Sequence, residues 1–144
     1  MQMAALVVAV LALTGVALVH VAWGVGSPWP FGNGEDLARN VVGDTSHMPP
    51  PWMSLVVAGL MFVAALLLPA AADVIGAPVS DRLVNIGAYG VVAVLGVRGI
   101  GGLAMSFYLY FAKGDRTPFV RNDIRFFSPL VTVLAVLSYL GSFT

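Results

Sequence analysis

The sequence predicts an all-α membrane protein, a bundle of four transmembrane helices with a short interfacial helix before the fourth. Hydrophobic residues make up 59% of the 144 residues, charged residues only 10%, and the apolar residues gather in four long runs. A soluble domain carries about 25% charged residues, whereas a helix needs roughly 20 mostly apolar residues to cross a hydrocarbon core about 30 Å thick. At this length we expect one integral membrane domain covering residues 1–144.

The first two spans are expected at about residues 3–26 and 51–72. Thr14 and His20 are the only strongly polar residues of the first run, and Ser54 is the only one of the second. No Lys or Arg precedes the first run, and the run is longer than the apolar region of a signal peptide. We therefore expect it to be retained as a span.

The third and fourth spans are expected at about residues 83–111 and 126–143, and both contain polar residues. Ser80 is predicted to cap the third helix. Ser128 and Pro129 form a favourable pair of N-cap and first-turn residues for the fourth. These two helices therefore contain most of the candidate chemistry.

Short runs of valine allow a strand interpretation, but they do not alternate between apolar and polar residues as the strands of membrane barrels do. Helices satisfy their own backbone hydrogen bonds in lipid, so an all-helical bundle is predicted. Residues 117–127 mix aromatic and charged side chains, as an amphipathic helix at the membrane surface does. The interfacial helix is therefore placed directly before the fourth span.

The distribution of Lys and Arg predicts the orientation, because positive residues are retained in the cytoplasm. The loops at residues 27–50 and 112–125 share one side of the membrane and hold five positive residues, whereas the loop between the second and third spans holds Arg82 alone. We therefore expect both of those loops in the cytoplasm and both termini outside. The five positive residues are Arg39, Lys113, Arg116, Arg121 and Arg125.

Arg98 is the most informative residue, because a charge inside the bilayer costs about 2.5–3.5 kcal/mol or more and usually has a partner within the protein. The residues at helical spacing around it, including Ser106, are small or polar, which is typical of a face where helices pack closely. We therefore predict that Arg98 points into the bundle. The glycines expected on this packing face are Gly87, Gly90, Gly99 and Gly102.

Helical geometry places His20, Arg98 and Asp123 at the same end of the bundle, on the side of the first and third loops. Two interpretations of Arg98 stay open: a structural ion pair with Asp123, or a site for an anion or lipid headgroup. His20 is interpreted first as a hydrogen-bonded residue at the membrane surface and second as a proton carrier. The candidates for a polar cluster or ligand site are His20, Trp23, Arg98, Tyr108, Arg121, Asp123, Arg125 and Ser128.

The composition also argues against several function classes. The chain has no cysteine, no net charge at pH 7 and no Asp or Glu within the four predicted spans. Thiol and Fe–S sites, a nucleic-acid partner and a proton-coupled transporter built on an intramembrane carboxylate are accordingly disfavoured. No complete catalytic set, metal cluster or cofactor-binding motif is evident, so no metal and no cofactor is predicted.

Three parts of the chain resemble one known family. They are residues 20–26 (HVAWGVG), Arg98 and residues 119–130 (FVRNDIRFFSPL). In order and spacing they resemble the small bacterial membrane proteins catalogued as domain of unknown function 3995, except that Phe127 stands where a tyrosine is expected. The resemblance implies a four-span protein of the bacterial cell (inner) membrane and implies no particular activity.

The lack of a catalytic set favours a non-enzymatic membrane protein, either an accessory subunit of a membrane complex or a small binding module. Its expected partners are membrane lipids, other membrane subunits or a second copy. The alternative is a membrane enzyme or carrier for an anionic lipid or isoprenoid headgroup, which Arg98 and Arg121 would hold while His20 or Asp123 moves protons. A small four-helix transporter ranks third, because the spans lack an acidic residue.

Overall fold

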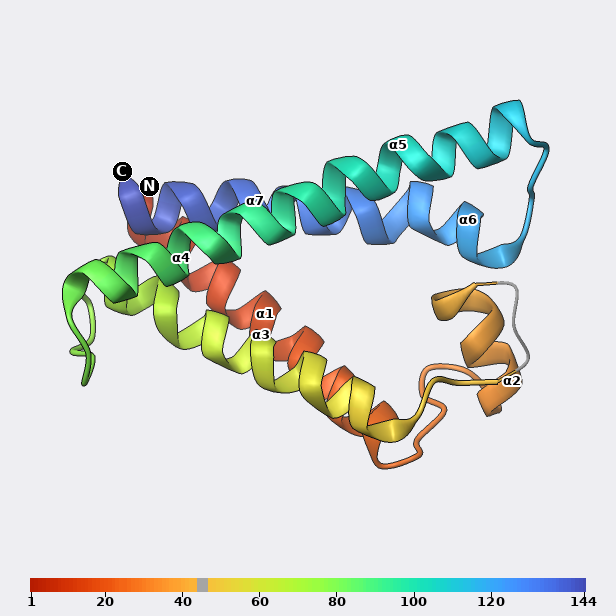
Figure 1. The fold of residues 1–144 in the computed structure, drawn as a ribbon, viewed down its shortest axis with the longest axis horizontal. Helices are drawn as coiled ribbons and strands as arrows, with labels where there is room; N and C mark the ends of the chain where they lie inside the picture. Colours follow the sequence, from red (N-terminus) through yellow and green to blue (C-terminus); the bar gives the residue numbers. More distant parts are fainter. Residues whose placement is uncertain (44–46) are drawn as a thin grey trace.

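The computed structural model in Figure 1 describes residues 1–43 and 47–144. All regular structure within those residues is helical, and no strand occurs among them. The elements labelled η are π-helical turns, in which each N–H bonds to the carbonyl five residues earlier. In chain order the elements are α1 (Gln2–Gly24), α2 (Gly34–Leu37), η1 (Ala38–Val42), α3 (Pro51–Ala71), α4 (Asp81–Gly96), η2 (Val97–Gly101), α5 (Gly102–Phe107), η3 (Tyr108–Ala112), α6 (Pro118–Asn122), η4 (Asp123–Phe127) and α7 (Ser128–Phe143).

Four continuous helices are long and apolar enough to cross a membrane: Gln2–Gly24, Pro51–Ala71, Asp81–Ala112 and Pro118–Phe143. The predicted all-helical class with four spans is therefore confirmed. The fourth helix begins at residue 118 rather than 126, because the interfacial helix joins it without a break. At 1.5 Å per residue the 32-residue third helix is about 48 Å long, so part of it must extend beyond a hydrocarbon core of about 30 Å.

The helices form two pairs that meet at one end of the bundle. α1 packs along α3 and α7, and α4 packs along α7 (Figure 1). The two termini lie close together at that end, whereas the α1–α3 pair and the α5–α6 pair separate toward the other end (Figure 1). The loops that join α1 to α3 and α5 to α6 therefore lie at the open end of the bundle.

Gly141 permits the closest contact at the end where the termini meet. A Cβ added at Gly141 would lie 2.7 Å from Leu6 Cα, so α7 and α1 pack backbone against backbone. The neighbouring Ser142 hydroxyl donates to the Leu68 carbonyl oxygen at 3.2 Å and links α7 to α3. Three helices are thereby joined within one turn of α7.

The core consists of small and aliphatic side chains, while the outside is also apolar. Leu11 is 67% exposed and Leu60 is 64% exposed, each on the outer face of its helix. Apolar residues on both faces of a helix are typical of a bundle whose outside contacts lipid. The buried residues of the central cluster are Leu6, Ala9, Leu13, Ala64, Ala65, Leu68, Ala88, Leu95, Leu134 and Ala135.

The predicted helix cap at Ser80 is confirmed in position, whereas the one at Ser128 is wrong. Ser80 is the N-cap residue of α4, although its side chain makes no capping hydrogen bond. Ser128 has helical angles (φ −66°, ψ −43°) and lies inside the continuous fourth helix, so its side chain is free to bond elsewhere. Pro129 has no N–H to donate to the carbonyl four residues earlier, and the π-helical turn η4 directly before it accommodates this interruption.

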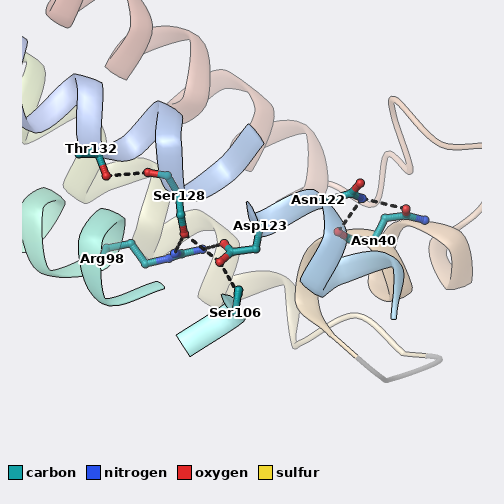
Figure 2. Close-up of polar contacts among 7 residues, drawn as sticks. All are labelled: Asn40, Arg98, Ser106, Asn122, Asp123, Ser128 and Thr132. Carbon is teal, nitrogen blue, oxygen red and sulfur yellow. Dashed lines mark hydrogen bonds and ion pairs between the residues drawn. The ribbon is translucent and has the colours of Figure 1, made fainter. Parts of the chain in front are cut away.

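The first loop contains a short helix that contacts the fourth span. Asn33 caps α2 by accepting the Asp36 backbone N–H at 2.8 Å. The turn η1 continues α2 and lies beside α6, where Asn122 Nδ2 donates to the Asn40 side-chain oxygen at 3.0 Å (Figure 2). This contact joins the first loop to the start of the fourth helix.

Candidate functional site

Asp123 is the centre of a polar network between the third and fourth helices (Figure 2). Its Oδ1 accepts a hydrogen bond from Arg98 Nη2 at 2.7 Å, and its Oδ2 accepts from the hydroxyls of Ser106 at 2.6 Å and Ser128 at 2.8 Å. The residue is only 1% exposed. A buried carboxylate is tolerated when it is paired and hydrogen-bonded in this way, so both oxygens of Asp123 are satisfied within the protein.

Ser128 connects the two charged residues. Its hydroxyl accepts from Arg98 Nη1 at 3.0 Å and donates to Asp123, so the three side chains form a closed set of contacts. One turn further on, the Thr132 hydroxyl donates to the Ser128 carbonyl oxygen at 2.8 Å. The fourth helix thus holds Ser128 by its backbone while the serine side chain contacts the third helix (Figure 2).

The Arg98 side chain is paired within the protein and is also partly exposed. The structure pairs it with Asp123, yet its side chain remains 45% exposed. The guanidinium of Arg98 contacts Asp123 and Ser128 within the bundle as predicted, while nearly half of the side-chain surface stays exposed. A guanidinium has more N–H donors than these two partners occupy.

Two glycines make room for the network. A Cβ added at Gly102 would lie 2.6 Å from Ser128 Oγ and would overlap the Arg98 guanidinium. A Cβ added at Gly99 would lie 2.6 Å from the backbone nitrogen of Thr132. Both glycines therefore permit the third and fourth helices to approach closely at the site.

The other two predicted packing glycines differ from each other. Gly87 contacts the Leu67 side chain, which would lie 3.0 Å from an added Cβ. Gly90 faces open space, with no atom within 4 Å of such a Cβ. The predicted packing face is therefore interrupted at Gly90, because α4 turns this position away from α3 and α7.

His20 and Trp23 lie away from the Arg98 network. The His20 Nδ1 donates to the Val16 carbonyl oxygen at 2.8 Å, and the His20 and Trp23 ring centres are 4.9 Å apart. Trp23 Nε1 donates to the Trp29 carbonyl oxygen at 2.7 Å. Among the described residues no hydrogen bond or ion pair joins His20 to Arg98 or Asp123, because the α1–α3 pair separates from the third and fourth helices at this end.

Arg121, Arg125 and Tyr108 lie at the outside of the same end. Arg121 and Arg125 are exposed and border a hollow of about 80 Å³ between the third and fourth helices. Tyr108 is 52% exposed, with Lys113 Nζ 5.8 Å from its ring centre. The side chains that line the hollow are Phe107, Tyr110, Phe111, Arg121, Ile124 and Arg125.

The comparison with protein families bears on the whole of this site. The family described as Protein of unknown function (DUF3995) matches residues 13–138. The chain belongs to this family. The predicted resemblance to domain of unknown function 3995 is thus confirmed, and the matched region contains Arg98, Ser106, Asp123 and Ser128. The comparison with curated proteins gave no match, and the comparison with solved structures gave none either.

In this DUF3995 chain the sequence reasoning missed the role of Ser106 and of the π-helical turns. Ser106 is on the predicted face of Arg98, two turns along, and that spacing was the available signal. Arg98 lies in η2 and Asp123 begins η4, so each charged residue of the pair lies in a helical turn that is wider than an α-helical one. Such turns are frequent at functional sites.

No metal-binding group is apparent in the part of the chain that the structure describes. Across residues 1–43 and 47–144, no three His, Cys, Asp or Glu side chains come together in a way that would hold a metal ion. The site offers a guanidinium that is held by Asp123 and Ser128 on a side chain that remains half exposed. Such a group binds carbonyl, carboxylate or phosphate oxygens.

Proposed function

We propose that this chain is a non-enzymatic binding module, an accessory subunit that packs against a neighbouring membrane protein through the outer face of its third helix. We define the outer face as Val94, Val97, Arg98, Gly101 and Met105. These positions share one side of the helix at a spacing of three, four or seven residues.

The observation that carries the proposal is the half-exposed side chain of Arg98. In a membrane, polar N–H groups that face acyl chains are costly, so a partner that accepts their hydrogen bonds stabilises the protein. Asp123 and Ser128 each accept one hydrogen bond from Arg98, and a guanidinium has more N–H donors than these two bonds use. A carbonyl or carboxylate of a neighbouring helix suits this position.

The surroundings of Arg98 also favour a protein partner. Val94, Val97 and Met105 are 68%, 75% and 58% exposed. Gly101 is exposed as well, with no atom within 4 Å of an added Cβ. A small residue beside a polar one allows another helix to approach closely, which is how membrane helices associate.

The geometry favours binding over catalysis. Both oxygens of Asp123 are occupied by structural contacts, and His20 bonds to its own helix. The enzyme alternative needs these two residues to move protons at one headgroup, yet they belong to separate groups of contacts. A catalytic role therefore has less support than a binding role.

We further propose that the chain resides in the bacterial inner membrane with loops 27–50 and 112–125 in the cytoplasm and both termini outside. The positive residues of these loops support this orientation. Because the chain has no cysteine, single cysteines at Lys113 and Val79 provide a direct test. A membrane-impermeant maleimide is expected to label Val79→Cys in intact cells and Lys113→Cys only after permeabilisation; the reverse pattern would refute the orientation.

The binding role is tested by a photo-crosslinking residue placed at Val97 in cells. We expect a discrete crosslinked product, with Leu11 as the control position because it is also exposed but lies on α1. A product of twice the 15.0 kDa chain mass identifies a second copy, and any other mass identifies a different subunit. A protein that gives no product at Val97, Gly101 or Met105 and is a lone monomer in mild detergent would rule out the accessory role.

A further inference from the structure

We propose that Arg121 and Arg125 form a binding site for the headgroup of an anionic phospholipid, in the hollow between α5–η3 and α6–η4. This site is distinct from the outer face around Arg98. It therefore adds a ligand to the protein and does not depend on the accessory role.

The two arginines are arranged for a shared ligand. They are four residues apart on one helix, so their side chains lie on the same side of it. Both border the hollow of about 80 Å³, whose opposite wall consists of Phe107, Tyr110 and Phe111. A ligand in this hollow contacts both guanidinium groups and the aromatic wall together.

Neither arginine is neutralised within the part of the chain that the structure describes. The ion pairs formed there are Arg39–Glu35 and Arg98–Asp123. Asp123 lies between the two arginines in sequence, but it is buried and bonded on the other side of the helix. Like charges four residues apart repel each other, so an anion that contacts both arginines stabilises the helix.

The loop before α6 holds one acid in a local contact. Asp115, in the loop before α6, accepts the Thr117 backbone N–H through Oδ1 at 3.0 Å. Arg116 of the same loop lies over the Tyr110 ring, 5.4 Å from its centre. The loop therefore adds positive charge at the hollow and holds its own carboxylate in a turn.

The shape and position of the hollow favour a lipid. Guanidinium groups bind phosphate oxygens through two parallel hydrogen bonds. Beside them Phe107 and Phe111 stack with ring centres 5.7 Å apart, and Phe111 is 72% exposed. This apolar surface lies beside the arginines at the loop end of the third helix. A phosphate at the arginines and an acyl chain along the rings match that arrangement, whereas free phosphate matches only the arginines.

The test is native mass spectrometry of the full chain in a neutral detergent, titrated with phosphatidylglycerol or phosphatidylcholine. We expect one phosphatidylglycerol to be retained and phosphatidylcholine to bind at least about tenfold more weakly. Both lipids offer the same phosphate oxygens, but the choline group adds a positive charge that Arg121 and Arg125 repel. The double substitution Arg121→Gln with Arg125→Gln should remove this preference. Arg82→Gln, which removes one positive charge at the opposite end of the third helix, should keep it.

Three outcomes would overturn the proposal. They are equal binding of the two lipids, unchanged preference in the double variant, and displacement of the lipid by inorganic phosphate at similar affinity. Lysines at both positions keep the positive charge but lose the planar set of guanidinium donors, so this variant should bind phosphatidylglycerol with intermediate affinity. It replaces the glutamine variant in the test if that variant does not fold. The crosslink from Val97 should persist in all these variants, so failure of the lipid site and failure of the accessory role are distinguished.

Discussion

Replacement of Asp123 by asparagine tests the network that joins the third and fourth helices. The substitution keeps the size of the side chain and removes its charge. The amide oxygen can still accept from Arg98, but an NH₂ group takes the place of Oδ2, which accepts from Ser106 and Ser128. Both hydroxyls must then rotate, and Arg98 loses its counter-charge.

The expected loss of stability follows from these contacts. Hydrogen bonds to a charged group contribute about 1.5–3 kcal/mol each and neutral ones about 1 kcal/mol. Removing one partner of a buried pair costs about 3–5 kcal/mol, and the partial exposure of Arg98 lowers that value. We therefore expect Asp123→Asn to reduce the free energy of unfolding by about 3 kcal/mol.

The assay is unfolding of the purified chain in mixed micelles with increasing SDS, followed by far-UV circular dichroism. The matched control is Asp73→Asn, at an exposed loop position with φ 56° that asparagine adopts readily. In a double-mutant cycle with Arg98→Gln, the two losses should overlap by at least about 1 kcal/mol. A loss below about 1 kcal/mol for Asp123→Asn, or strictly additive losses, would refute the coupling described above.

Three further predictions use the same unfolding assay or limited proteolysis. Gly102→Ala should destabilise the protein by about 1–3 kcal/mol, because its methyl group overlaps the Arg98 guanidinium. Gly90→Ala should be neutral or stabilising by up to about 1 kcal/mol. Equal effects of the two substitutions would contradict the packing described at Gly102. Gly141→Ala should also cost about 1–3 kcal/mol by separating α7 from α1, and an unchanged midpoint would show that the helices do not touch there. Asn122→Ala should speed protease cleavage within the first loop several-fold and leave the SDS midpoint within about 0.5 kcal/mol, while unaltered cleavage would mean that the Asn40 contact does not hold the loop.

The spans were predictable because apolar length is a strong signal in a membrane. A run of some twenty apolar residues has few other stable states in lipid, so the bounds of the first three spans lie within two residues of those predicted. The pairing of Arg98 with Asp123 was one of two interpretations, since Asp123 is the carboxylate that lies just before the fourth span on the same side as Arg98. Because a charge in lipid is costly, Arg98 was expected to have a partner within the protein.

The arrangement of the helix pairs was not predictable in the same way. The separation that leaves His20 apart from Arg98 depends on the angle between pairs, which close contacts such as Gly141 against Leu6 set. Periodicity identifies a face of small residues but not the helix that packs against it. The open space around Gly90 could therefore not be predicted. The π-helical turns shift the register by one residue, and a pattern based on 3.6 residues per turn does not reveal such a shift.

The sequence separation of the ion pair has a consequence for biogenesis. Arg98 and Asp123 are 25 residues apart, on consecutive helices joined by a short loop. When the second half of the chain enters the bilayer as a hairpin, it therefore brings its own counter-ion and does not wait for the first hairpin. The charge of the arginine is therefore compensated within its own hairpin before any other subunit binds.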